Sequence, residues 1–244
     1  MKTYIYQFYS FVFILLLLSC SKESNTTTEI ETGSITGEVN LFSSRGGFAP
    51  DENMQVTIEG SDLLLTVFTD SIGEYTFEDI PYGRYDLRFE KEGFGTFKRG
   101  DIIHQNEETI IELPENLSRE STTGITQLTL SETETGITIS LVTSPPANSF
   151  SERYARLFFN IGSETSSTIF GYFTPVLRVE STPYVQSFTF EEFESLGFIS
   201  GAPIFIKAYG ESLFSNEYID PNNGDRIFPN INPNTTSNVS FIMP

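Results

Sequence analysis

The sequence predicts an all-β protein made of two tandem β-sandwiches. Apolar and polar residues alternate over short stretches along most of the chain, which is the period of strands that bury one face. Gly, Pro, Asn and Asp separate these stretches, as turns require. A helical signal interrupts the pattern at 189–197. With 244 residues, the chain is long enough for two ordinary domains.

The N-terminus predicts export and lipid anchoring. Lys2 precedes an apolar run, Phe8–Leu18, which is too short to span a bilayer, so 1–19 is predicted to be a signal peptide. Leu17-Leu18-Ser19-Cys20 resembles the lipobox of bacterial lipoproteins. That resemblance implies cleavage before Cys20 and acyl chains such as palmitate on its sulfur and new amino group. The alternative is an ordinary signal peptide with a chance cysteine, but the sole Cys ends the apolar run.

Residues 20–33 form the predicted lipidated cysteine and flexible tether. Ser21–Thr32 is polar and has almost nothing to bury. With the aromatic-rich signal peptide, this tether resembles those of Bacteroidota lipoproteins. The resemblance implies an outer membrane lipoprotein on the periplasmic or cell-surface face, with the lipid anchor as its contact with the membrane.

The first domain is predicted to span 34–115. A first strand buries the face that contains Ile35, and Leu63–Phe68 forms a later strand. Gly93–Asp101 is expected to turn the chain. The remaining inward positions of the predicted strands are Gly37, Val39, Leu41, Val56, Ile58, Thr109, Ile111 and Leu113.

Two turns with a strand between them organise this domain, in the stretch Thr69–Leu87. Asp70-Ser71-Ile72-Gly73 has the chemistry of a type I turn closed by a left-handed glycine, which predicts a hairpin. Ile80-Pro81-Tyr82-Gly83 repeats that chemistry. We expect Gly73 and Gly83 to need backbone angles at which a Cβ is costly, so Gly→Val at either should destabilise by about 1–2 kcal/mol or more.

The spacing T-D-x-x-G-x-Y-x-F-x-x-I-P-x-G-x-Y-x-L resembles the carboxypeptidase regulatory-like domain, which is a transthyretin-like (prealbumin-like) sandwich with a carbohydrate-binding-like fold. The matching residues are Thr69, Asp70, Gly73, Tyr75, Phe77, Ile80, Pro81, Gly83, Tyr85 and Leu87. The resemblance covers Ser34–Pro114, about a third of the chain. It implies a fold and, through related modules, carbohydrate binding; it does not define an activity.

A linker, 116–123, and a second domain, 124–244, follow. Pro145-Pro146 predicts that the strands on either side of it lie in different sheets or are joined by an excursion. Thr189-Phe190-Glu191-Glu192 is a capping box that predicts one short helix ending at Gly197. The domain loosely resembles an immunoglobulin or fibronectin sandwich. Its predicted strands contain Ile137, Ile139, Leu141, Leu157, Phe159, Ile161, Ile169–Phe173, Val176–Val179, Ile204, Ile206, Ala208, Val239, Phe241 and Met243.

Charge and rare residues exclude several functions. The net charge of −19, from 33 acidic and 14 basic residues, disfavours a nucleic-acid partner, because that affinity needs Lys and Arg on phosphates. A single Cys allows no disulfide framework. Because His104 is the only histidine, a zinc peptidase or a Ser/Cys hydrolase has too few groups. We therefore predict no enzyme, no catalytic residues and no cofactor.

Three polar groups remain as candidates. Asp220, Asn222 and Asp225 form a weak calcium candidate, although Asn-Gly in the same loop favours a plain turn. Asp70-Ser71-Ile72 resembles the O-glycosylation sequon of exported Bacteroidota proteins, a weak candidate because the turn also explains it. The acids at 191, 192 and 194 are interpreted as favouring the helix N-terminus.

The sequence thus predicts a membrane-anchored, non-catalytic lipoprotein that acts as a binding or scaffold module for a carbohydrate or a protein. The alternative is a carboxylate-only glycan hydrolase, which would need two carboxyls about 5–10 Å apart in a concave, aromatic-lined cleft. The aromatic platforms considered for a sugar are Tyr82, Tyr172, Tyr184 and Tyr209.

Overall fold

The computed structural model describes residues 31–59 and 65–244. Cys20, the predicted signal peptide, nearly all of the tether and part of the predicted strand Leu63–Phe68 lie outside these residues. Thr32–Pro244 form one compact unit. In this described part, no helix is both long and apolar enough to cross a bilayer.

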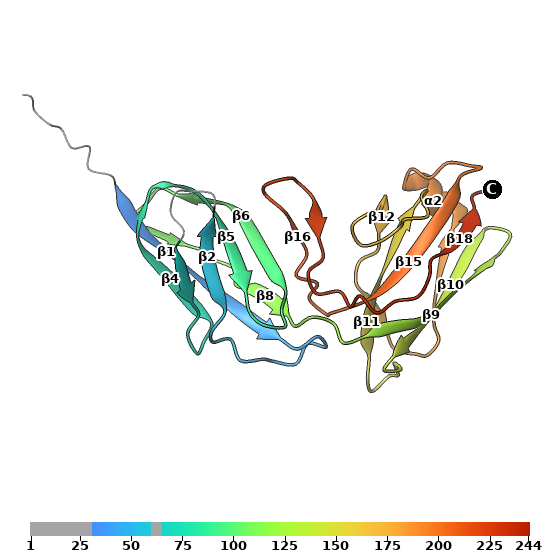
Figure 1. Cartoon of the computed structure of the whole chain (residues 1–244), viewed down its shortest axis with the longest axis horizontal. Helices are drawn as coiled ribbons and strands as arrows, with labels where there is room; N and C mark the ends of the chain where they lie inside the picture. The colour runs from blue at the N-terminus through green and yellow to red at the C-terminus, as the bar shows by residue number, and fades with distance from the viewer. Residues whose placement is uncertain (1–30, 60–64) are drawn as a thin grey trace, which may run out of the picture. The chain divides into compact units, whose positions relative to one another are not determined.

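The first sandwich has two facing sheets (Figure 1). In one sheet, β4 pairs with β1 antiparallel, while β7 and β8 pair parallel with successive halves of β1. The other sheet is antiparallel, in the order β3-β2-β5-β6. The strands are β1 (Thr32–Phe42), β2 (Gln55–Glu59), β3 (Thr66–Phe68), β4 (Glu74–Pro81), β5 (Gly83–Glu90), β6 (Thr96–His104), β7 (Glu108–Ile110) and β8 (Glu115–Ser118).

Strict alternation builds the core between these sheets. Along β1, for example, Ile35, Val39 and Leu41 are fully buried, while the polar residues that alternate with this face, at 36, 38 and 40, are half-exposed. Phe77 of β4 and Phe89 of β5 meet them in the same core. Because one face of each strand is removed from water, the hydrophobic pattern defines the register. The all-β prediction is confirmed.

The turn at Asp70–Gly73 has the predicted chemistry, but it does not close a hairpin. The Asp70 carboxylate accepts hydrogen bonds from the backbone N–H groups of Ile72 and Glu74, and Gly73 has φ +85°. However, β3 and β4 belong to different sheets, and so do β4 and β5. The hairpin prediction was therefore wrong. Short turns can also carry a chain from one layer of a sandwich to the other when each strand buries its own inward face.

The two turn glycines differ. A Cβ at Gly73 would lie 2.1 Å from the Val39 carbonyl oxygen and would also occupy a positive φ. Gly83 begins β5 outside the positive-φ region, so the prediction for its backbone was wrong; Asp79, with φ 57°, has the left-handed conformation nearby. A Cβ at Gly83 would instead approach the Tyr85 ring at 3.2 Å.

Two further segments depart from the sequence prediction. β6 begins at Thr96, inside the segment 93–101 that was expected to turn; its polar side chains from Lys98 to Asp101 hide the strand pattern. β8 occupies the start of the predicted linker, 116–123, and buries Leu117 in the first core. A single buried leucine is too weak a signal for a strand that pairs with distant β1.

The second sandwich also consists of two facing sheets, in the orders β14-β10-β9 and β12-β11-β15-β18, with β13 also paired to β11. As predicted, the strands on either side of Pro145-Pro146 lie in different sheets. The strands are β9 (Gly124–Glu132), β10 (Gly136–Ser144), β11 (Arg153–Asn160), β12 (Tyr172–Phe173), β13 (Leu177–Val179), β14 (Tyr184–Thr189), β15 (Pro203–Glu211) and β18 (Val239–Ile242).

The predicted capping box is present at helix α2 (Phe190–Ser195). The Thr189 hydroxyl accepts from the Glu192 N–H at 3.1 Å, and the Glu192 carboxylate accepts from the Thr189 N–H at 2.7 Å. Phe193 is buried in the second core. Glu192 therefore has a structural role at the start of the helix, as interpreted from the sequence.

Between β15 and β18 the chain makes an excursion, defined here as residues 212–232, which includes the paired strands β16 (Tyr218–Ile219) and β17 (Arg226–Ile227). Its Phe228 packs with Phe158 and Tyr209 in an apolar cluster on the outer face of the β11–β15 sheet. On its other side, β16 contacts β6 of the first sandwich (Figure 1). The excursion thus belongs to the second sandwich in sequence but contacts both.

Candidate ligand-binding groove

An open groove of about 940 Å³ lies at one end of the sheet β3-β2-β5-β6. Strand side chains form its floor, and two connecting segments form its wall. Its lining residues are Asn53, Gln55, Phe68, Glu90, Lys91, Glu92, Gly93, Gly95, Thr96, Arg119 and Glu120.

The floor of the groove is one continuous row of cross-strand neighbours. Phe68 on β3 pairs with Gln55 on β2, Gln55 pairs with Glu90 on β5, and Glu90 pairs with Thr96 on β6. Neighbouring strands lie about 4.8 Å apart, so the row extends for about 14 Å. The row presents, in order, an aromatic ring, an amide, a carboxylate and a hydroxyl. The ring can stack on a ligand, and the polar groups include both hydrogen-bond donors and acceptors.

Phe68 is the exposed aromatic residue of this row, with 60% of its surface accessible. The tyrosines considered from the sequence are less available: Tyr209 is buried, Tyr172 and Tyr184 pack on the second core, and Tyr82 lies edge-on to His104. Phe68 was not among the aromatic residues considered from the sequence, which placed it only in a predicted strand. Its neighbour Val67 is the residue that packs on the core.

Neighbouring charges hold the floor in place. The Thr96 hydroxyl donates to the Glu90 carboxylate at 3.1 Å, and Arg88 forms an ion pair with Glu90. Arg88 also contacts Glu59 at 2.6 Å, and Lys98 reaches the same carboxylate at 3.0 Å. The two carboxylate oxygens of Glu90 are thus each held by one donor, Thr96 or Arg88.

The cations of the groove are also positioned. The Lys91 ammonium donates to the carbonyl oxygens of Pro50 and Glu52, at 2.6 and 2.5 Å. The Arg119 guanidinium lies 5.1 Å from the centre of the Phe94 ring. Burial lowers the pKa of Lys91, and the charge of Arg119 lowers it further, while Asp51 and Glu52 raise it.

The described residues contain no group of three or more His, Cys, Asp or Glu side chains that could hold a metal ion. His104 is buried at the end of β6, where Nδ1 lies 2.7 Å from the Thr109 hydroxyl and Nε2 lies 3.1 Å from the Ile80 carbonyl oxygen. Both ring nitrogens are therefore engaged with protein groups outside the groove.

The calcium candidate forms the turn between β16 and β17. The Asp220 carboxylate accepts from the Asn222 backbone N–H at 2.9 Å and from its side-chain amide at 3.0 Å. The Asn223 amide donates to Asp225 at 2.8 Å, and Lys98 lies 3.8 Å from Asp220. These carboxylates are thus directed at protein donors, and calcium binding stays a prediction.

The weak modification candidate, Ser71, is exposed at the turn between β3 and β4. It lies between exposed Asp70 and Ile72, so a glycosyl group at its hydroxyl would extend into solvent. Modification of this residue remains a prediction.

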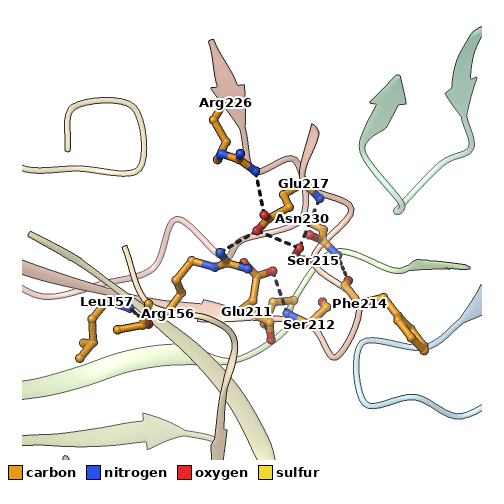
Figure 2. A network of polar contacts seen from close by, with 11 residues as sticks. Arg156, Leu157, Glu211, Ser212, Phe214, Ser215, Glu217, Arg226 and Asn230 are labelled. Atoms are coloured by element: carbon orange, nitrogen blue, oxygen red, sulfur yellow. Dashed lines mark hydrogen bonds and ion pairs between the residues drawn. The ribbon is translucent and has the colours of Figure 1, made fainter. Parts of the chain in front are cut away.

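A second polar centre lies beneath the excursion (Figure 2). Arg156, which is 2% exposed, contacts Glu211 at 3.2 Å and Glu217 at 2.6 Å, and Arg226 contacts Glu217 at 2.9 Å. The Arg156 guanidinium lies 4.8 Å from the centre of the Phe228 ring. Burial raises the pKa of Glu211 to about 7, although Arg156 opposes the shift.

This centre was not predicted because its members are far apart in sequence. Arg156 and Glu211 are separated by 55 positions and meet through the pairing of β11 with β15. Two cations and two carboxylates balance in this cluster. The arrangement therefore fixes the excursion to the second sandwich.

The first sandwich thus combines two facing sheets with an open, partly aromatic polar groove. Residues 34–113 match the model of the carboxypeptidase regulatory-like domain, which confirms the resemblance for the first sandwich. Among curated proteins, none matches the chain.

Solved structures give weak overall likenesses. A Bacteroides uniformis protein suggested to bind carbohydrate has 12% identity and a TM-score of 0.32, over 86% of this chain and 99% of that one. A DUF3823 family protein from Parabacteroides merdae has 11% identity and a TM-score of 0.27, over 75% and 92%. A cohesin–X-dockerin complex from Acetivibrio cellulolyticus has 16% identity and a TM-score of 0.30, over 36% and 59%. At these TM-scores the likenesses carry no argument about function.

Proposed function

We propose that this chain is a non-catalytic, membrane-anchored binding protein that takes a carbohydrate chain into the groove of its first sandwich. The row Phe68–Gln55–Glu90–Thr96 is the observation that carries the proposal. A sugar ring has an apolar C–H face that packs on an aromatic ring, and hydroxyls that both donate and accept. The row offers both kinds of contact along one line.

The charges of the groove favour an uncharged glycan. Lys91 and Arg119 are outnumbered by the carboxylates of Glu90, Glu92 and Glu120. The whole chain has a net charge of −19, so its field repels polyanions. A neutral oligosaccharide is repelled neither by the carboxylates of the groove nor by the net negative charge of the chain. Its hydroxyls can form hydrogen bonds with the carboxylates and cations of the groove, which are held in fixed positions.

Binding is tested by screening the purified protein against neutral oligosaccharides and measuring the affinity of the best one by calorimetry. We expect Phe68→Ala and Gln55→Ala each to weaken binding about tenfold, because each loses about 1–1.5 kcal/mol of contact energy. Phe150→Ala is the control, since Phe150 is fully exposed outside the groove.

Unchanged affinity in Phe68→Ala would place the ligand elsewhere. The release of new reducing ends from a bound glycan would instead support the alternative function, a carboxylate-only glycan hydrolase. Replacing Glu90 by Gln should then abolish turnover, whereas under the binding proposal no turnover occurs in either protein.

Anchoring through Cys20 is a separate part of the proposal and rests on the sequence alone. Lipidated Cys20 would hold the chain on the outer membrane, because two or more acyl chains bind a bilayer stably. Replacing Cys20 by Ala should release the protein into the soluble fraction or leave the precursor uncleaved. Full partition of this variant into detergent would contradict the anchor.

A further inference from the structure

The wall of the groove consists of two short connecting segments. One is the turn at 93–95, in which Gly93 and Gly95 have φ values of +78° and +69°. The other is Arg119-Glu120, directly after β8. A single backbone bond, from the Glu120 N–H to the Gly93 carbonyl oxygen at 2.7 Å, joins them. Glycines in a surface turn leave the backbone many alternatives, so the wall needs support.

The side-chain amide of Asn216, in the excursion, joins the same two segments. Its Oδ1 accepts from the Ser118 N–H at 2.8 Å, while its Nδ2 donates to the Phe94 carbonyl at 3.0 Å and the Ser118 carbonyl at 2.8 Å. Phe94 lies between the two wall glycines, and Ser118 precedes Arg119. Asn216 is 5% exposed, so these bonds are shielded from water.

Other residues of the excursion contact the wall from the same side. The Ser212 hydroxyl donates to the Arg119 carbonyl at 2.7 Å. A Cβ at Gly95 would come within 2.8 Å of the Pro229 carbonyl oxygen, so the excursion packs directly against the wall turn. The excursion itself is fixed at its far side by Arg156, through Glu217 (Figure 2).

We propose that Asn216 is a positioning residue for the groove, and that the second sandwich completes the binding site of the first by bracing its wall. This inference rests on the proposed function of the groove. It gives the second sandwich a role that requires no ligand contact of its own. Without the hydrogen bonds of Asn216, the floor row would remain intact, but Arg119 and the wall turn would no longer be held in the binding geometry.

The variant that tests this inference is Asn216→Gly. Asn216 has φ +50°, which glycine adopts without strain, so the substitution removes the amide and not the backbone conformation. Asn238→Gly is the matched control, because the Asn238 amide also donates to two carbonyls, those of Ser163 and Thr165, but away from the groove.

Two measurements are made on the whole protein: amide hydrogen exchange without ligand, and glycan affinity by calorimetry well below the melting temperature. In Asn216→Gly we expect at least tenfold faster exchange in 93–97 and 118–121, and an affinity about five- to tenfold lower. In Asn238→Gly we expect wild-type exchange in both segments and wild-type affinity.

The outcomes separate this inference from the proposed function. Wild-type affinity in Asn216→Gly, or an equal loss of affinity in both variants, would overturn the positioning role. If the wild-type protein binds no glycan, the proposed function fails, and amide hydrogen exchange alone then tests whether Asn216 supports the groove wall. Unchanged protection of 93–97 in Asn216→Gly overturns that role. Loss of protection in this variant but not in Asn238→Gly supports it.

Discussion

The outer faces of two sheets, β3-β2-β5-β6 in the first sandwich and β12-β11-β15-β18 in the second, are built from different side chains. The first face has rows of polar residues with the exposed ring of Phe68 at one end. The second has buried Arg156, Phe158 and Tyr209, which the excursion covers. The aromatic residues of the second face are thus covered by the protein's own chain, whereas Phe68, among polar groups, stays exposed.

Matched Phe→Ala substitutions on the two faces should show the largest contrast. Phe158 is fully buried among aromatic rings, so Phe158→Ala should lower the free energy of unfolding by about 3–5 kcal/mol. Phe68→Ala should change it by less than about 0.5 kcal/mol. Urea unfolding of both variants measures the difference. A similar loss in both would mean that the groove face is also part of a packed core.

Arginine substitutions sharpen the same comparison. Arg156→Met leaves Glu211 and Glu217 without their buried partner, which should cost about 3–5 kcal/mol. Arg88, on the open face, is 26% exposed and pairs with carboxylates near solvent, so Arg88→Met should cost about 1 kcal/mol or less. The double variant Arg156→Met with Glu211→Gln should regain part of the loss. An Arg156→Met protein as stable as wild type would contradict a structural role for this centre.

The covered face should also respond to pH. Burial raises the pKa of Glu211 from about 4.5 to about 7, so the folded state binds a proton more tightly than the unfolded state. Stability from this group is complete below about pH 4.5 and falls as pH rises toward about 7, by up to about 3 kcal/mol. Glu211→Gln removes this dependence.

The measurement is the free energy of unfolding of wild type and of Glu211→Gln between pH 4.5 and 8. The difference between the two proteins isolates Glu211, because the other acids titrate in both. Parallel curves would show that the carboxylate is already ionised throughout this range.

The smallest expected effect concerns calcium at the excursion. The Asp220 and Asp225 carboxylates are directed at Asn222, Asn223 and Lys98, so millimolar calcium should leave the melting temperature unchanged relative to chelator. A calcium-dependent rise that disappears in Asp220→Ala with Asp225→Ala would establish the site and show that this loop of the covered face also binds an ion.

Local patterns predicted from sequence were correct where one segment contains the whole signal. The alternation around Ile35 and the capping box at Thr189 needed no distant partner. The groove floor could not be predicted, because Phe68 and Thr96 meet only through the register of strands between them. The Arg156–Glu211 pair likewise depends on the alignment of β11 with β15.

The turns show a different limit. Asp70–Gly73 specifies a reversal of the chain, and the structure has one, but the local sequence contains no information on which sheet the next strand joins. That choice depends on how the inward residues of β4, such as Phe77, pack against those of β5. Turn chemistry alone therefore predicted a hairpin where the chain changes layers.

The parallel pairing of β1 with β8 has a mechanical consequence. Arg119, in the groove wall, bonds to the Phe42 carbonyl at the end of β1, while Thr32 at the other end is where the tether would join. The strand contains 11 residues, so its two ends lie about 33 Å apart. A force between a bound ligand and the tether would therefore run along β1 and load its hydrogen bonds to β4, β7 and β8 in shear. Many bonds of β1 would resist this load together.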